Sequence, residues 1–566
     1  MGGFVLLLAT NALVLSVPWL LREAIDGLEA GEPIGTTIRY SIAIVVVALL
    51  QAVVRTFSRL AILGNSRKIC YDIRERFFRH LLSLGATFYD SHRVGDIMSR
   101  GVNDIRQIQG FFGPGVMNVA NTTIIYTAAA VLLFRIDATL TLFALGIYPI
   151  LFLTVNRLNR RIYSTSVAVQ EQLATISSRV QENISGIQQV KTYAQEDREI
   201  EMFSAECNIY RERNLAMAAT RGTMISLIGV VAGAGSLVVL FLGGRAVIDG
   251  RISLGDFIAF NAYLGLLVWP TIALGWILNT FQRGLGAADR LLEILRVEPD
   301  VVDGEDRLPT DGPLRGDLEI RGLTFRHASD DTSRPPSLRD IDLKIPKGSR
   351  IAIVGPVGSG KSTLVNILAR VYPVPRDRVF VDGVDLNDIP LERWRRSVGY
   401  VPQEAFLFSR TIQENVIFGR PDAEAEEIGR AIRISNLEGD LAAFPEGIET
   451  PVGERGFTLS GGQRQRATLA RAVLTDPDVL ILDDSLSSLD ADTERSVLEQ
   501  LGHWRSERTT ILITHRLTSL ANMDRILVLE EGRIVEDGSH EQLVAADGLY
   551  RQLFDRQRLQ QRLEQG

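Results

Sequence analysis

The stretch RIAIVGPVGSGKSTLVNILARVY, residues 350–372, decides how the second half of this chain folds. A short apolar run leads into a glycine-rich loop, and the loop leads into a segment with the pattern of a helix. Gly355, Gly360, Lys361 and Ser362 fit the spacing G-x-x-x-x-G-K-S/T. Glycines at this spacing allow backbone N–H groups to wrap phosphates, while the lysine reaches the outer phosphates and the serine hydroxyl binds Mg²⁺. The stretch therefore predicts an α/β P-loop nucleotide-binding domain.

A second stretch, VLILDDSLSSLD at residues 479–490, carries the acids that such a domain needs. Four apolar residues run into Asp483 and Asp484, which indicates a buried strand ending in two carboxylates. The first acid is placed to hold Mg²⁺ beside the phosphates. The second is placed as a base for the attacking water. Such a base is more often a glutamate, so Asp484 is shorter than expected by one methylene.

The first half of the chain is different, because residues 1 to about 290 contain long apolar runs. A membrane span needs about 20 mostly apolar residues. We expect six spans, at roughly residues 3–21, 38–54, 111–134, 138–155, 224–242 and 257–278. Six such segments in one half argue against buried helices of a soluble protein. The sequence thus predicts an all-α transmembrane domain of six helices.

The loops between these spans alternate in length and charge. Two long segments, residues 65–100 and 156–221, are rich in arginine, whereas the other loops are short and poor in positive charge. By the positive-inside rule the long segments and both chain ends are cytoplasmic. We expect spans two to five to continue past the membrane and to join in short cross-helices near residues 86–100 and 185–203.

These patterns divide the chain into four parts. We expect a transmembrane domain with its cytoplasmic cross-helices at 1–295, a Pro/Gly/Asp-rich linker at 296–316, a nucleotide-binding domain at 317–552 and a charged tail at 553–566. The net charge of −7 argues against nucleic acid as a partner, because a nucleic-acid binder is expected to be basic.

Further motifs follow the phosphate loop in a fixed order. LSGGQRQR at 459–466 precedes the Asp483 strand, GYVPQEAFLF contains Gln403, and ILITHRL contains His515. TPVGERG at 450–456 and SSLD at 487–490 accompany them. With these motifs the chain resembles an ABC exporter half-transporter over nearly its whole length. They look like the ABC signature, the Q-loop, the switch histidine, the X-loop and the D-loop of that family.

The resemblance implies a type I ABC exporter fold, an ATPase activity coupled to transport, and ATP and Mg²⁺ as cofactors. It assigns catalytic roles to Asp484, Gln403 and His515, and Mg²⁺ binding to Ser362, Gln403 and Asp483. The implied nucleotide-binding residues are His327, Gly355, Gly358, Ser359, Gly360, Lys361, Ser362, Thr363, Ser460, Gly461, Gly462 and Gln463.

Two positions depart from the family's pattern. The aromatic residue that stacks on adenine is usually a tyrosine, but TFRHAS places His327 there, which can stack with less area. Asp484 stands where the family has its catalytic glutamate. Removing a methylene withdraws the carboxylate by about 1 Å, and misplacement on that scale can cost about 10²-fold in rate. Both departures fall on the phosphate-loop side, while the signature is intact.

This combination resembles one subunit of a heterodimeric multidrug-type exporter. We expect an ATP-driven exporter of hydrophobic or amphipathic compounds in the cell (inner) membrane, with its nucleotide-binding domain in the cytoplasm. Its partners would be the lipid bilayer and a second half-transporter that carries the glutamate. The alternatives are a homodimeric exporter of lipid or peptide, in which Asp484 works slowly, and a nucleotide-gated channel or regulatory subunit.

Overall fold

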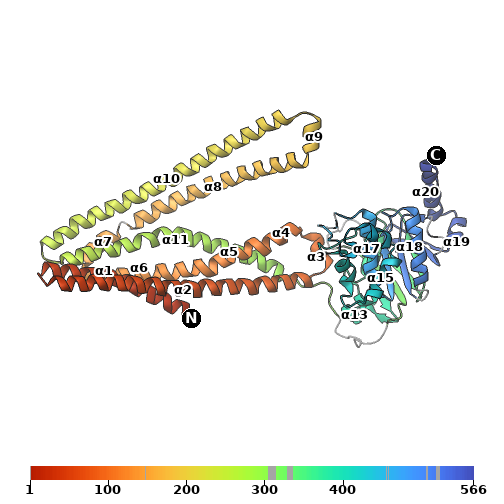
Figure 1. Cartoon of the computed structure of the whole chain (residues 1–566), viewed down its shortest axis with the longest axis horizontal. Coiled ribbons are helices and arrows are strands. Elements are labelled where there is room, and N and C mark those ends of the chain that lie inside the picture. Colours follow the sequence, from red (N-terminus) through yellow and green to blue (C-terminus); the bar gives the residue numbers. More distant parts are fainter. Residues whose placement is uncertain are drawn as a thin grey trace. The chain divides into compact units, whose positions relative to one another are not determined.

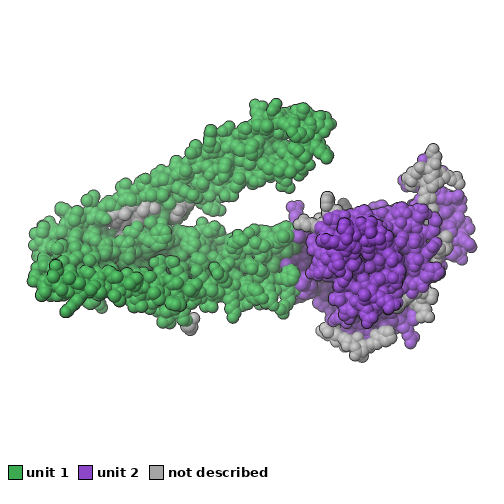
Figure 2. All heavy atoms as spheres, viewed as in Figure 1, with its two compact units in different colours: residues 1–80, 95–296 green, residues 81–94, 297–566 purple. Residues whose placement is uncertain are grey.

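The computed structural model describes residues 2–146, 148–303, 314–327, 335–453, 456, 458–504, 508–517, 520 and 523–565. The chain divides into two compact units, the first containing residues 1–80 and 95–296 and the second containing residues 81–94 and 297–566 (Figure 2). Residues 81–94 therefore belong to the unit that holds the second half of the chain, although both of their flanking segments belong to the first unit.

Helices form the first unit throughout its described residues. They are α1 (Gly2–Glu29), α2 (Ile34–Ser83), α4 (Val94–Ser99), α5 (Ile105–Gly110), α6 (Val116–Ile136), α7 (Ala138–Leu145), α8 (Tyr148–Ser185), α9 (Ile187–Thr192), α10 (Glu196–Ile248) and α11 (Leu254–Leu295) (Figure 1). The sequence prediction of an all-α architecture for this half is confirmed.

Within the described residues, five segments are long and apolar enough to cross a membrane. These are α1, α2, the run Val94–Ile136, α10 and α11. Five of the six predicted spans lie within them. The fourth, at 138–155, includes residue 147, which lies outside the described residues, and α7 and α8 flank that position.

Several helices are longer than a membrane requires. Helix α2 has 50 residues and α10 has 53, which correspond to about 75 and 80 Å against a hydrocarbon thickness of about 30 Å. Helices α8 and α10 lie side by side and are joined through the short α9 (Figure 1). The structure thus has the long helices and the short connecting helices that the arginine-rich segments predicted.

The core of the first unit lies where α1, α6, α10 and α11 meet. Leu133, Val239, Phe260 and Leu267 are completely buried there. The Tyr263 hydroxyl on α11 donates a 2.9 Å hydrogen bond to the carbonyl of Leu15 on α1. Such interhelical bonds add to close packing, which is the main force between helices in lipid.

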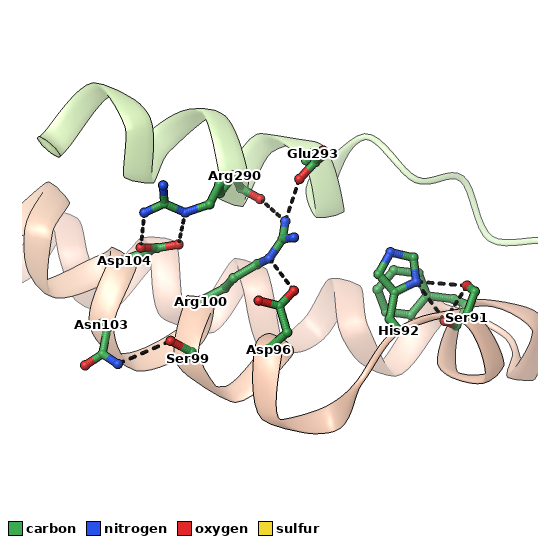
Figure 3. Close-up of polar contacts among 10 residues, drawn as sticks. Ser91, His92, Asp96, Ser99, Arg100, Asn103, Asp104, Arg290 and Glu293 are labelled. Carbon is green, nitrogen blue, oxygen red and sulfur yellow. Dashed lines mark hydrogen bonds and ion pairs between the residues drawn. The ribbon is translucent and has the colours of Figure 1, made fainter. Parts of the chain in front are cut away.

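Two π-helical turns, η1 (Arg100–Asp104) and η2 (Phe111–Gly115), separate α4, α5 and α6. Beside η1, Arg290 of α11 donates hydrogen bonds of 3.0 and 2.6 Å to the two oxygens of Asp104 (Figure 3). Arg100 binds Asp96 at 2.9 Å and Glu293 at 2.7 Å. The Arg290–Asp104 pair is bidentate and its carboxylate is buried, so it is stronger than an exposed pair and fixes η1 against the end of α11.

The described residues of the second unit form two sheets. One is antiparallel with strand order β2-β1-β4-β5, and the other has the order β10-β9-β3-β8-β7-β6, parallel except at β10. The strands are β1 (Leu318–Phe325), β2 (Leu338–Ile345), β3 (Arg350–Val354), β4 (Val379–Val381), β5 (Val384–Asp385), β6 (Val398–Val401), β7 (Val479–Asp483), β8 (Thr509–Ile513), β9 (Arg525–Glu530) and β10 (Arg533–Gly538).

The helices of this unit are mostly short. They are α3 (Ala86–Ser91), α12 (Lys361–Leu368), η3 (Leu386–Asp388), α13 (Leu391–Ser397), α14 (Ile412–Val416), η4 (Ile417–Gly419), α15 (Ala425–Ile434), α16 (Glu438–Ala443), η5 (Gly447–Glu449), α17 (Gly461–Leu474), α18 (Ala491–Trp504), α19 (His540–Ala545) and α20 (Leu549–Gln565). The predicted order of strand, glycine loop and helix is confirmed by β3 and α12.

The parallel strands separate two hydrophobic cores. Along β3, Ile351 and Ile353 enter the core shared with α12 and the antiparallel sheet, whereas Ala352 and Val354 enter the core shared with α15 and α17. Strand β7 alternates in the same way. Both faces of these strands are buried, which explains why their sequences are continuous apolar runs. The α/β fold predicted for this half is confirmed.

Candidate nucleotide site

The phosphate loop follows β3, and its glycines are required by the backbone path. Gly355 and Gly360 have φ angles of 148° and 98°. A Cβ at Gly355 would lie 2.0 Å from the Leu529 carbonyl oxygen, and one at Gly360 would lie 2.6 Å from that of Ser337. No side chain fits at these distances, so local packing by itself requires glycine at both motif positions.

Lys361 begins α12 directly after this loop and is buried. Its Nζ donates hydrogen bonds to the carbonyl oxygens of Gly355 at 2.9 Å and Pro356 at 2.7 Å. Burial lowers the pKa of Lys361, while the carboxylates of Asp483 and Asp484 oppose that shift. The ammonium group is therefore held against the inner surface of the loop, where a polyphosphate chain would be received.

The two acids lie at the end of β7. Asp483 is buried, and its Oδ1 accepts a 3.0 Å hydrogen bond from the Ser362 hydroxyl. Burial raises the pKa of Asp483 and also that of the half-buried Asp484, for which His515 opposes the shift. Two desolvated carboxyl groups side by side favour the binding of a cation between them and the loop.

The oxygen atoms of these side chains are suitable ligands for a magnesium ion. Mg²⁺ prefers oxygen ligands and takes only one or two from the protein when phosphates supply others. Ser362 and Asp483 provide one hydroxyl and one carboxylate oxygen in contact, and Gln403 lines the same cleft. The described residues contain no cluster of three or more histidines, cysteines or acids suited to a metal held by protein alone.

One cleft of about 640 Å³ collects most of the predicted site. Its lining includes residues that follow four parallel strands: Gln403 after β6, the phosphate loop after β3, Asp483 and Asp484 at β7, and His515 after β8. In open α/β sheets the ligand site lies at the carboxyl ends of the strands. Gly358, Gly360, Lys361, Ser362 and Thr363 also line this cleft. Motifs that are distant in sequence thus meet because their strands are adjacent and parallel.

The cleft also contains residues that the sequence patterns missed. Arg339 and Glu531 line it, together with Ser337 and Gly532. The β9–β10 turn reaches the cleft because the Gly532 N–H donates to the Ser359 carbonyl at 3.1 Å, and the Arg339 N–H donates to the Gly532 carbonyl at 2.7 Å. No motif marked this turn, because its position depends on pairing between distant segments.

Asp484 has an unusual backbone. Its φ of +44° lies in the left-handed region, its N–H donates to the Ile513 carbonyl at 2.9 Å, and its carbonyl accepts from the Ser487 hydroxyl at 2.8 Å. Aspartate and asparagine tolerate this conformation better than other side chains, apart from glycine. The aspartate is therefore locally compatible with the turn, a reason for its presence that sequence spacing did not show.

His327 follows β1 and lies beside the cleft. Its Nε2 is 3.2 Å from the hydroxyl of Thr363, a residue of the cleft wall. The His327 ring contacts Phe325 and Tyr372 edge-on, at centroid distances of 5.1 and 4.8 Å. The imidazole is thus anchored beside the wall of the cleft, and its stacking on a base stays a prediction.

The signature residues lie apart from this cleft. Ser460 caps α17: its hydroxyl accepts from the Gln463 N–H at 3.2 Å, and the Gln463 side chain accepts from the Ser460 N–H at 2.9 Å. Gly461 and Gly462 form the first turn and pack against Ser488 and Leu489. Among the described residues, none of the four signature residues lines the cleft. Gly461 and Gly462 stand in the first turn of α17, where backbone N–H groups have no partner within the helix, and a helix N-terminus of this kind suits an anion.

The X-loop prediction falls partly outside the described residues. In the segment 450–456, residues 454 and 455 are not described. The Thr450 carbonyl accepts from the Ile412 N–H at 3.1 Å, and the Val452 N–H donates to the Arg410 carbonyl at 2.8 Å. These bonds hold the beginning of the segment against the loop that follows Gln403.

Comparisons with known proteins agree with the interpretation of both halves of the chain. The family model for the ABC transporter transmembrane region matches residues 1–271, and the ABC transporter model matches residues 338–487.

Two curated relatives match nearly the full length. The chain is 34% identical over 559 residues to the probable multidrug resistance ABC transporter ATP-binding/permease protein YheI of Bacillus subtilis (strain 168), covering 98% of this chain and 95% of the relative. It is 31% identical over 566 residues to the multidrug resistance-like ATP-binding protein MdlA of Escherichia coli (strain K12), covering 100% and 95%.

A solved structure agrees with the fold. A bacterial Atm1-family ABC exporter with ATP bound aligns with a TM-score of 0.81 and 26% sequence identity, covering 98% of each chain.

Proposed function

The chain belongs to the ABC exporters, with a transmembrane region fused to an ATPase domain, and from that premise we propose that it is the weakly hydrolysing subunit of a heterodimer. It is a multi-pass membrane protein of ATP-binding/permease type. The proposed activity is ATP-driven export of small hydrophobic or amphipathic compounds from the cytoplasmic side of the cell membrane. The observation that carries the proposal is the aspartate, Asp484, at the position of the base.

ATP and Mg²⁺ are the proposed cofactors of the cleft. Lys361 would bind the outer phosphates, and the backbone N–H groups of residues 358–363 would wrap them. Ser362 and Asp483, in contact at 3.0 Å, would hold the metal ion, which neutralises phosphate charge when bound. Gln403 and His515 line the same cleft and would position the attacking water and the γ-phosphate.

The slow hydrolysis that we propose for this site follows from the short side chain of Asp484. Asp484 is fixed by its backbone bond to Ile513 and by its left-handed φ, so the main chain has little freedom to bring the carboxylate forward. The missing methylene therefore separates the carboxylate from the position of the glutamate by about 1 Å, and loss of base catalysis costs roughly 10² to 10⁴ in rate.

The separation of the signature from the cleft supports a site shared between two chains. A competent site needs donors at the γ-phosphate, and α17 offers them at its N-terminus, away from this chain's own cleft. ABC exporters work as dimers, so we assign this signature to the partner's phosphate loop. The partner's signature would then close on the cleft described here.

The proposed substrate class rests on two observations. Apolar side chains such as Ile225, Leu237 and Phe241 are exposed along α10, which suits a lipid environment. The curated relatives are named as multidrug exporters, and we extend that property to this chain as part of the proposal.

Reconstitution tests the proposal. The chain alone, and the chain with a half-transporter that carries glutamate at the corresponding position, are purified in lipid nanodiscs and their ATPase rates compared. The pair should be faster by about 10²-fold, the scale set by loss of a positioned base. Robust ATP turnover together with dye transport by the chain alone would instead establish a homodimeric exporter.

A further inference from the structure

Asp440 on the short helix α16 contacts two side chains of α17. Its Oδ1 accepts a 3.0 Å hydrogen bond from Nε2 of Gln463, and its Oδ2 accepts a hydrogen bond from the guanidinium of Arg466. Gln463 and Arg466 are three positions apart, so they lie on one face of α17. One carboxylate therefore holds the first two turns of the helix that begins with the signature glycines.

The contact with Asp440 fixes the orientation of the Gln463 amide. A carboxylate only accepts hydrogen bonds, so the amide NH₂ group faces Asp440 and the amide oxygen faces away from it. That oxygen, Oε1, accepts the 2.9 Å hydrogen bond from the Ser460 N–H at the cap of α17. If the amide turned over, its NH₂ group would face the Ser460 N–H and the cap would lose this bond. Asp440 thus supports the cap through Gln463.

Arg466 neutralises the charge that Asp440 brings to this end of α17. The side chain of Arg466 is 12% exposed and that of Asp440 is 20% exposed, so water screens the pair only in part. Within the part of the chain that the structure describes, Asp440 is the one acid paired with Arg466. An unpaired carboxylate here would oppose an anion at the helix N-terminus, whereas the ion pair carries no net charge.

Packing against the hydrophobic core places Asp440 beside α17. Leu437 is buried in the core that also contains Ala467 of α17, and Leu441 packs against the same core. Asp440 lies between these two leucines on a helix of six residues, which is too short to be stable in isolation. The position of the carboxylate is therefore set by tertiary packing of α16.

We propose that Asp440 is a positioning residue for the ATP held by the partner: it orients Gln463 and so keeps the N-terminus of α17 in the conformation that receives the γ-phosphate. The inference rests on the proposed function, because it assigns this signature to the partner's phosphate loop. Asp440 is not among the described residues that line this chain's own cleft. Its substitution should therefore change hydrolysis at the partner's site and leave nucleotide binding in this chain's cleft unchanged.

Steady-state kinetics with MgATP test this role in the full chain paired with its glutamate-bearing partner, in nanodiscs. Asp440→Asn keeps the shape of the side chain but leaves one acceptor oxygen for two donors, so one contact is lost. We expect kcat to fall at least about tenfold, on the scale of a small misplacement, and KM to stay within about twofold. Asp440→Glu keeps two acceptor oxygens and should recover most of the lost kcat.

A second set of variants examines the ion pair. Arg466→Gln leaves the Asp440 carboxylate unpaired and should also lower kcat. The double variant Asp440→Asn/Arg466→Gln removes both charges and should be no worse than Asp440→Asn alone, because the two residues act as a unit.

Asp524→Asn is the matched control, because Asp524 also accepts from two donors. These are the Arg350 N–H at 2.8 Å and the Arg350 guanidinium at 2.9 Å, and neither belongs to α17. This variant should have the kcat and KM of the wild type.

The unfolding midpoint of each pair separates positioning from a general loss of structure. Wild-type kcat in Asp440→Asn overturns the inference, as does a loss of kcat that Asp440→Glu does not reverse or that appears only where the midpoint falls to the assay temperature. If Asp440→Asn does not assemble with the partner, Arg466→Gln decides, because wild-type kcat in that variant overturns the inference as well.

Vanadate-dependent photolabelling with an azido-ATP distinguishes this inference from the proposed function. Label that appears mainly on this chain in the wild-type pair overturns the proposed function. Label that appears on the partner and is reduced by Asp440→Asn supports the inference, whereas label on the partner that Asp440→Asn leaves unchanged overturns the inference alone.

Discussion

The phosphate-loop cleft and the N-terminus of α17 are two faces of one unit to which we assign nucleotide binding, and they differ in how closely they follow the family's pattern. The cleft side departs from it twice, at Asp484 in the cleft and at His327 beside it. The signature face keeps LSGGQ, with Ser460 and Gln463 forming a reciprocal cap that leaves the helix N-terminus open to an anion. The departures are therefore confined to the face that would bind this chain's own ATP.

This difference has a functional consequence in a dimer. If each nucleotide is bound between one chain's cleft and the other chain's signature, the two faces of this chain serve different ATP molecules. Damage to the intact face should then impair the competent site, whereas damage to the altered face should impair a site that is already slow. Four substitutions test this comparison.

The largest effect should come from Gly461→Glu in this chain alone. A Cβ at Gly461 has an ordinary 3.6 Å contact with Ser488, so a small group fits, but a carboxylate there would repel the γ-phosphate. Loss of preorganised donors typically costs about 10² to 10³ in rate. The steady-state ATPase rate of the proposed heterodimer measures this loss of activity. Gly502→Glu, at an open position on α18, is the control and should have no effect.

A smaller loss of ATPase activity is expected for Lys361→Ala. The substitution removes the buried cation of the phosphate loop only at the site that we propose is weak, so ATPase of the proposed heterodimer should fall by less than about tenfold, or about 1.4 kcal/mol of activation free energy. The exposed Lys347 offers a control substitution to alanine. A loss greater than that of Gly461→Glu would mean that this chain's cleft holds the competent site.

Substitutions of Asp484 should change ATPase less still. Asp484→Asn tolerates the left-handed backbone equally well and removes only the charge, so the rate should change by less than about twofold. Asp484→Glu restores the reach and should raise the rate, at most to about double, because one site already turns over. Complete loss in Asp484→Asn would identify Asp484 as the main base.

The smallest effect concerns stability and pH. Burial raises the pKa of Asp484 above its unfolded value, so the folded protein binds more protons and its stability falls as pH rises from about 4 through the raised pKa. Asp484→Asn removes the free-energy cost of burying the charged carboxylate. The unfolding midpoint of the nucleotide-free protein should rise by about 1 to 3 °C at pH 7, and less near pH 4. Asp492→Asn, 91% exposed at its side chain, should show no such difference.

The sequence predicted the elements whose signals are local. The glycine spacing at 355–362 requires the turn between β3 and α12, and the apolar run ending at Asp483 is β7. The grouping of Gln403, Asp483 and His515 was implied by the resemblance of their motifs to the ABC exporters, and the structure places them in one cleft because parallel strands end at one edge of the sheet. Long apolar helices were predictable for the same reason, because composition alone determines whether a segment suits lipid.

Features that depend on distant pairing were not predictable. The positive φ of Asp484 arises from its bond to Ile513 in β8, 29 residues later by sequence number. Glu531 reaches the cleft in the β9–β10 turn, and Arg339 reaches it at the start of β2, which is hydrogen-bonded to Gly532 of that turn. The membership of residues 81–94 in the second unit depends on tertiary contacts such as Asp90 with Tyr372, which no periodicity encodes.

Vanadate trapping with a photoactive ATP analogue tests the central claim most directly. Vanadate holds ADP at a site that has just hydrolysed ATP, so ultraviolet cross-linking then labels the chain whose phosphate loop performs hydrolysis. In the heterodimer, the label trapped under turnover conditions should appear on the partner, with little on this chain. Equal or stronger vanadate-dependent labelling of this chain would contradict the assignment of the weak site to the cleft that contains Asp484.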